Sequence, residues 1–65
     1  MTKTFNITNG TTAEIAFNEL TGEFVMHHFA HNSIRSMGRY KTMGEAVDRL
    51  HKLASMWGGY EVTEA

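Results

Sequence analysis

The chain has 65 residues with neither Cys nor Pro, and its formal net charge at pH 7 is −1. This length allows one domain, residues 1–65. The lack of cysteine excludes a disulfide framework and a thiolate zinc site, and it favours a cytoplasmic protein. No apolar run approaches the roughly 18 residues of a membrane span, so we expect no membrane partner.

The first two predicted strands, residues 3–8 and 11–18, form a hairpin around Asn9-Gly10. Apolar and polar residues alternate in both segments, which is the period of a strand. A turn with Gly10 in a left-handed conformation shifts the pairing by one residue relative to a two-residue turn. We favour this register because it gathers the apolar side chains on one face: Phe5, Ile7, Ala13 and Ile15.

A short helix over residues 12–20 is the alternative for the second element. Thr11-x-x-Glu14 has the pattern of a capping box, and Ala13, Ala16, Phe17 and Leu20 have helical spacing. Strand-forming residues oppose this reading, because Thr12, Ile15 and Phe17 are β-branched or aromatic. The sequence favours the strand without excluding the helix.

Residues 23–30 form the predicted third strand, and a four-residue loop at 19–22 sets Phe24 opposite Phe17. Alternation then assigns side chains to a core face (Phe24, Met26 and His28) and to the opposite face (Val25, His27 and Phe29). Residues 34–41 form the fourth strand. Uninterrupted alternation places Ile34, Ser36, Gly38 and Tyr40 on one face of this strand. The other set, which contains three cations, projects to the face away from the core: Arg35, Met37, Arg39 and Lys41.

A single amphipathic helix is predicted over residues 43–57. Thr42 is its N-cap with Glu45 three residues later, and Gly58-Gly59 ends it. Its apolar stripe comprises Met43, Ala46, Val47, Leu50, Leu53, Ala54 and Trp57. Residues 60–63 form a short last strand or an ordered tail. The predicted fold is therefore a two-layer α+β domain, with an antiparallel sheet of three or four strands packed on one C-terminal helix.

The sheet face away from the helix is the candidate partner surface. Residues 24–44 carry three cations and no acid, a net charge of +3, between two acidic ends. An uncovered face that mixes apolar and basic side chains is typical of an interaction surface. The candidate partner-binding residues are His27, Phe29, Arg35, Met37, Arg39 and Lys41.

The sequence offers little for catalysis or metal binding. His27 and His31 share one face of a strand while His28 opposes them, and no carboxylate lies nearby to complete a metal site. The serines at 33, 36 and 55 lie in no nucleophile motif. We therefore expect a protein that is not an enzyme and that uses no cofactor or metal.

Residues 34–54, with the run from Met37 to Ala46 continuing to Asp48 and Ala54, resemble the last strand and helix start of ethylene-response-factor (Apetala-type) DNA-binding domains and of the arm-binding domains of phage integrases. The shared pattern is a bulky residue, Gly, any residue, an aromatic, any residue, Thr, then Glu-Ala, here Met37-Gly38-Arg39-Tyr40-Lys41-Thr42 and Glu45-Ala46. Those families place the open face of a three-stranded sheet in the DNA major groove. The resemblance implies a DNA-binding module that uses a basic strand, with Arg35, Arg39 and Lys41 on phosphates.

In size, autonomy and lack of catalytic residues the chain is also similar in type to small phage-encoded inhibitors of bacterial defence, including anti-CRISPR proteins. This likeness implies a non-enzymatic inhibitor, encoded by a phage or mobile element and present in the host cytoplasm as a monomer or weak dimer. Its partner would be a host protein or a nucleoprotein complex such as a CRISPR effector. We favour this function over DNA binding.

Overall fold

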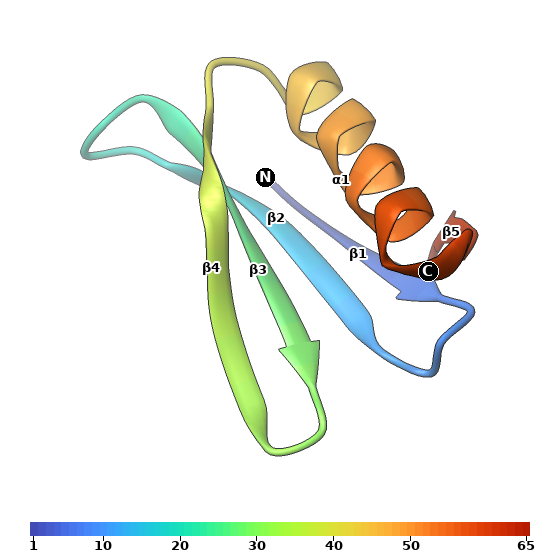
Figure 1. The fold of residues 1–65 in the computed structure, drawn as a ribbon. Helices are drawn as coiled ribbons and strands as arrows, with labels where there is room; N and C mark the ends of the chain where they lie inside the picture. Colours follow the sequence, from blue (N-terminus) through green and yellow to red (C-terminus); the bar gives the residue numbers. More distant parts are fainter.

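The computed structural model describes residues 1–65 as one antiparallel sheet covered on one face by a single helix (Figure 1). The strand order is β4-β3-β2-β1-β5. This is the two-layer α+β domain that the sequence predicts, with a fifth strand formed by the C-terminal tail. The elements are β1 (Thr2–Ile7), β2 (Thr12–Asn18), β3 (Glu23–Ala30), β4 (Ser33–Tyr40), α1 (Met43–Gly58) and β5 (Val62–Glu64).

The β1–β2 hairpin has the predicted bulged register. Phe5 pairs with Ala13, and the N–H of Ile7 donates to the carbonyl of Thr11 over 3.0 Å. Gly10 has a φ of 89°, a left-handed conformation that glycine adopts without steric cost. Since Thr12–Asn18 pairs with β1 on one side and β3 on the other, the alternative helix over residues 12–20 does not form.

The β2–β3 hairpin is also as predicted. Phe17 pairs with Phe24, and residues 19–22 form the loop between the strands. The two rings lie 5.1 Å apart, centroid to centroid, in a tilted arrangement. Met26 is fully buried beneath the helix, so the core face of β3 was assigned correctly.

The predicted alternation of β4 is wrong over its first half, because the strand contains a β-bulge. Val25 pairs with Arg39, whereas His27 pairs with Ser36, so Met37 and Gly38 together face Met26. The extra residue reverses the faces of all preceding positions. Arg35 and Met37 therefore lie on the helix side of the sheet, and Ile34 and Ser36 lie on the opposite side.

Gly38 makes this bulge sterically possible. Its φ is 116°, and a Cβ atom there would lie 3.0 Å from the hydroxyl oxygen of Tyr40. That hydroxyl donates to the carbonyl oxygen of Met37 over 2.9 Å. Tyr40 thus packs along its own strand and closes the bulge on the helix side.

The helix begins and ends as the sequence predicts. The Thr42 Oγ1 accepts a hydrogen bond from the N–H of Glu45 over 3.1 Å. At the other end, the N–H groups of Gly59 and Tyr60 donate to the carbonyls of Ser55 and Ala54. The helix is neither long nor apolar enough to cross a membrane.

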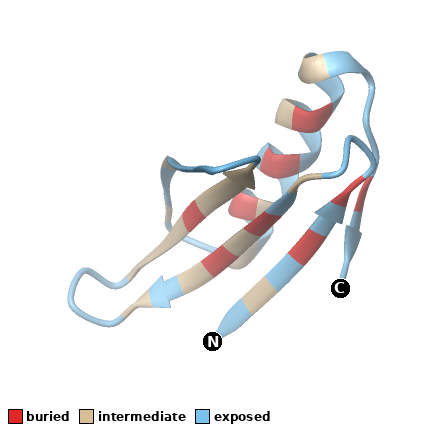
Figure 2. Ribbon diagram, turned by 90° about the horizontal axis from the view of Figure 1, so that it is seen from below, coloured by how far each residue is buried: buried red, intermediate tan, exposed pale blue.

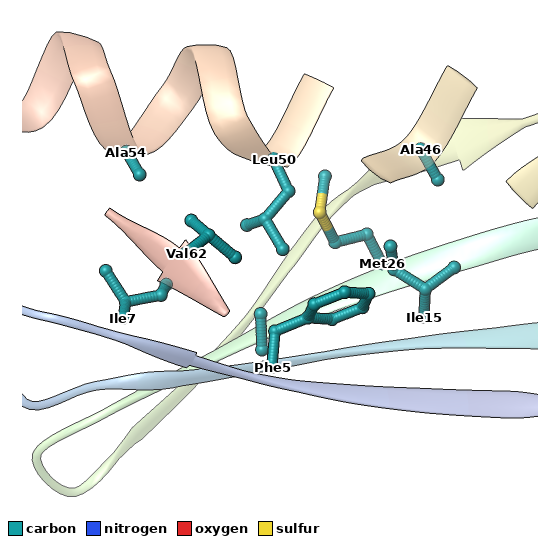
Figure 3. Packing of buried hydrophobic residues seen from close by; sticks show 9 residues of the cluster. Phe5, Ile7, Ile15, Met26, Ala46, Leu50, Ala54 and Val62 are labelled. Carbon is teal, nitrogen blue, oxygen red and sulfur yellow. The ribbon is translucent and has the colours of Figure 1, made fainter. Parts of the chain in front are cut away.

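The core lies between α1 and the sheet. Buried positions alternate with more exposed ones along the strands and recur on the inner side of α1 (Figure 2). Leu50 points from the helix toward Met26 and Val62 (Figure 3). The nine buried residues are all hydrophobic: Phe5, Ile7, Ala13, Ile15, Met26, Ala46, Leu50, Ala54 and Val62.

The tail strand β5 completes the sheet beside β1. Ile7 pairs with Val62 and Phe5 with Glu64, and Lys3 forms an ion pair with Glu64 at 3.5 Å. Val62 is buried, so this short strand contributes to the core as well as to the sheet.

Candidate partner-binding surfaces

The bulge divides five of the six predicted partner residues between two surfaces. His27, Phe29 and Arg39 lie on the sheet face away from α1, which we call the open face. Arg35 and Met37 lie on the helix side instead. Lys41 follows the end of β4 and is exposed in the connection to α1. The single basic face expected from alternation therefore does not exist.

An apolar pair stands on the open face at the tip of the β3–β4 hairpin. Phe29 pairs with Ile34 on β4 and with Thr12 on β2. Phe29 is half-buried, whereas 69% of Ile34 is exposed. No second layer covers this face, and the tip of the hairpin extends away from α1 (Figure 1). Ile34 was not predicted as a partner-binding residue, because uninterrupted alternation places it on the core side of β4.

Beyond this pair, the β3–β4 half of the open face carries His27 and Arg39 beside the apolar Val25. His27 lies between its strand neighbours Glu14 and Ser36. Arg39 pairs with Val25 across the sheet and approaches Glu23 at 3.9 Å, a long and exposed ion pair. Such a pair contributes little stability, about 0–1 kcal/mol, so Arg39 can exchange this partner for another.

A hollow lies on the helix side of the sheet, where β3 and β4 extend beyond the end of α1. Its volume is about 390 Å³, within the range of about 300–1,000 Å³ that is common for ligand pockets. We call it the Trp57 groove. It is lined by Asn9, Thr11, His28, Ala30, Ser33, Arg35, Met37 and Trp57.

His28 forms one wall of the Trp57 groove and is fixed by two contacts. Its ring stacks on Trp57 with centroids 4.7 Å apart, and its Nε2 lies 2.9 Å from the Thr11 hydroxyl oxygen. That hydroxyl donates its only proton to Asn9 Oδ1 over 2.5 Å. Nε2 must therefore be the donor to Thr11, which leaves Nδ1 of the neutral ring without a proton.

The environment keeps His28 neutral. Desolvation by burial lowers the pKa of its imidazole below the ordinary value of 6.5, and the positive charge of Arg35 lowers the pKa further. The wall that His28 forms is therefore uncharged near neutral pH. Arg35 supplies the groove's full positive charge.

Arg35 has no acidic partner. The two ion pairs of the protein join Lys3 to Glu64 and Arg39 to Glu23. None of the residues that line the Trp57 groove is acidic. An exposed guanidinium in a groove without carboxylates presents its donors to whatever binds there.

The histidines do not converge. His27 and His28 project to opposite faces of β3, and His51 is exposed on α1. No three His, Asp or Glu side chains come together in an arrangement that could hold a metal ion.

The bulge and the Trp57 groove were not predicted from the sequence, for different reasons. The bulge carries a local signal, since an isolated Gly inside a strand pattern often marks one. Gly38 could therefore have been read as an interruption of the alternation. The Trp57 groove carries no such signal, because it joins a turn, two strands and a helix end that are distant in sequence.

The fold and these surfaces define the protein as a two-layer α+β domain with an uncovered sheet face and one groove, lined by both apolar and polar side chains. Comparisons with protein families, with curated proteins and with solved structures gave no match.

Proposed function

We propose that the chain is a non-enzymatic protein-binding inhibitor, similar in type to anti-CRISPR proteins, that covers a surface of a larger nucleoprotein complex. The observation that carries this proposal is the Phe29–Ile34 pair, which stands on a sheet face that nothing covers. The inhibitor would dock through the β3–β4 half of that face.

The composition of this surface favours a protein partner. Protein interfaces commonly combine a buried aromatic or aliphatic anchor with Arg at its margin. Here Phe29 and Ile34 supply the apolar anchor, and Arg39 lies on the same face toward the other end of β4. Anchors of this kind typically contribute about 2 kcal/mol or more to binding when they are fully buried.

The alternative, binding of DNA by a basic strand, is supported less well. That function needs several cations on one face to follow a phosphate backbone. The bulge instead separates Arg35 from Arg39 on opposite faces of β4, and Lys41 lies beyond the strand. The formal net charge of −1 also disfavours non-specific attraction to nucleic acid.

A binding assay with matched variants tests the proposal. The tagged protein is immobilised and exposed to a panel of purified CRISPR effector complexes, each with its guide RNA, before and after nuclease treatment. We expect at least one complex to be retained after nuclease treatment and to lose at least tenfold in affinity with Ile34→Asp. Leu20→Asp is the control, since Leu20 is 97% exposed in the distant β2–β3 loop.

Three outcomes would overturn the proposal. The first is that no complex in the panel is retained. The second is that Ile34→Asp binds as tightly as the unaltered protein. The third is that retention disappears when the nuclease is a deoxyribonuclease that leaves the guide RNA intact, which would favour the DNA-binding alternative. Because Ile34 is exposed, its substitution should leave the fold intact, and circular dichroism verifies this.

A further inference from the structure

The outer edge of β4 is an unpaired sheet edge. β4 forms its ladder with β3, and the strand order places no other strand beside it. Such an edge presents backbone N–H and C=O groups to any extended chain that approaches. The bulge at Met37–Gly38 distorts the second half of the strand, so the regular part of the edge is Ser33–Ser36.

This short edge presents two different side chains to its two faces. Ile34 projects to the open face and is 69% exposed. Arg35 projects to the helix side and lines the Trp57 groove without an acidic partner. A strand added beside β4 would therefore meet an apolar side chain on one face and a cation on the other.

We propose that an extended acidic segment of the protein partner adds to the sheet along Ser33–Ser36 as a sixth strand. One carboxylate of this segment enters the Trp57 groove and binds Arg35. The adjacent residue of the segment is apolar and packs against Ile34, because neighbours in a strand project to opposite faces. This inference rests on the proposed function and names the chemistry of the partner.

Charge complementarity favours an acidic segment as the strand that binds beside Ser33–Ser36. Arg35 binds a carboxylate through a planar pair of donors, and a charge-assisted bond of this kind is stronger than a neutral one. The Ser33 hydroxyl lies in the same lining and can also donate. Met37 and Trp57 supply apolar contact for the methylene groups of a Glu side chain.

Two other occupants fit less well. A second copy of this chain would offer its own β4 edge, but residues 24–44 contain no acid to meet Arg35. A nucleic acid strand would need several cations along its path, and Arg35 is the only cationic Arg or Lys side chain that lines the groove.

The test uses two five-residue peptides and the isotope-labelled protein in solution. The first is acetyl-Thr-Val-Glu-Val-Thr-amide, and the second has Gln in place of Glu. We expect the Glu peptide, titrated to millimolar concentration, to shift the amide resonances of Ser33–Ser36 and the indole N–H of Trp57. The Gln peptide should bind about tenfold more weakly, the loss of one charge-assisted bond.

Substitutions establish which cation binds the Glu side chain of the peptide. Arg35→Ala should weaken the Glu peptide about tenfold and leave the Gln peptide nearly unchanged, since a double-mutant cycle isolates the pairwise interaction. Arg49→Ala is the matched control, because Arg49 is an exposed arginine of α1 that lies outside the open face and does not line the Trp57 groove. It should alter neither affinity.

Several results would overturn the inference. Equal binding of the two peptides, or shifts confined to β5 or to the part of the open face around His27 and Arg39, would exclude docking on the β4 edge. Competition by a five-nucleotide oligothymidylate for the same resonances would indicate nucleic acid instead. If Ile34→Asp abolishes binding to an effector complex while Arg35→Ala does not, the proposed function stands and the acidic strand does not.

Discussion

Truncation of Leu50 tests the packing of α1 on the sheet. This side chain is fully buried and points toward Met26 and Val62 from the middle of the helix (Figure 3). Leu→Ala changes at such sites destabilise proteins by about 3–5 kcal/mol, because a cavity remains in addition to the lost burial. A domain of 65 residues has about 3–10 kcal/mol of stability at roughly 0.05–0.15 kcal/mol per residue. Leu50→Ala should therefore remove at least about a third of the stability and can remove all of it.

Urea unfolding followed by Trp57 fluorescence and far-UV circular dichroism measures this loss. We expect a lower midpoint with an unchanged slope, the mark of a change in stability alone. Ile34→Ala is the control, since Ile34 is 69% exposed and its truncation should change the stability by no more than about 0.5 kcal/mol. A cost below about 1 kcal/mol for Leu50→Ala would contradict the packing described here.

Three further changes have defined outcomes. Gly38→Ala should destabilise the protein by about 1–2 kcal/mol in urea unfolding, because the φ of 116° is strained for any side chain. Gly44→Ala should instead stabilise it by up to about 1 kcal/mol, since this helical glycine has ordinary φ and its Cβ would meet only the Thr42 hydroxyl at 3.9 Å. Because folding lowers the pKa of His28 below 6.5, the neutral ring favours the folded state. Stability should be complete above pH 6.5 and decline as the pH falls through the lowered pKa, with a parallel decrease of Trp57 fluorescence from contact with the charged ring. His28→Asn should remove both effects, and a pH profile that this substitution leaves unchanged would contradict the assignment.

Local signals in the sequence determined most of the fold. Asn9-Gly10 and the loop at residues 19–22 each fix a hairpin register, and the fully buried Ile15 and Met26 follow from those registers. Thr42 and Gly59 bound the helix as its sequence predicts. These features depend on residues that are close in the chain, which is why they can be predicted.

The candidate site was predicted less well because it depends on which face of the sheet each side chain of β4 projects to. A single extra residue at Gly38 moves Arg35 from the open face to the Trp57 groove, although Arg39 stays where alternation assigns it. The groove also needs Thr11 and Trp57 beside Arg35. Those residues are far apart in the chain, and only the packed structure shows that they meet.

The pairing of β1 with β5 has a consequence for the order in which the chain assembles. Among neighbouring strands of the sheet, these two alone are distant in sequence, and the N–H of Ala65 donates to the carbonyl of Thr4 near the other terminus. A circular permutant that begins at Lys41, ends at Tyr40 and joins Ala65 to Met1 by a short Gly-Ser linker would have the element order α1-β5-β1-β2-β3-β4. Every pair of strands would then be a local hairpin. Because folding slows as contacts become less local, this permutant should fold faster than the natural order while keeping the same core.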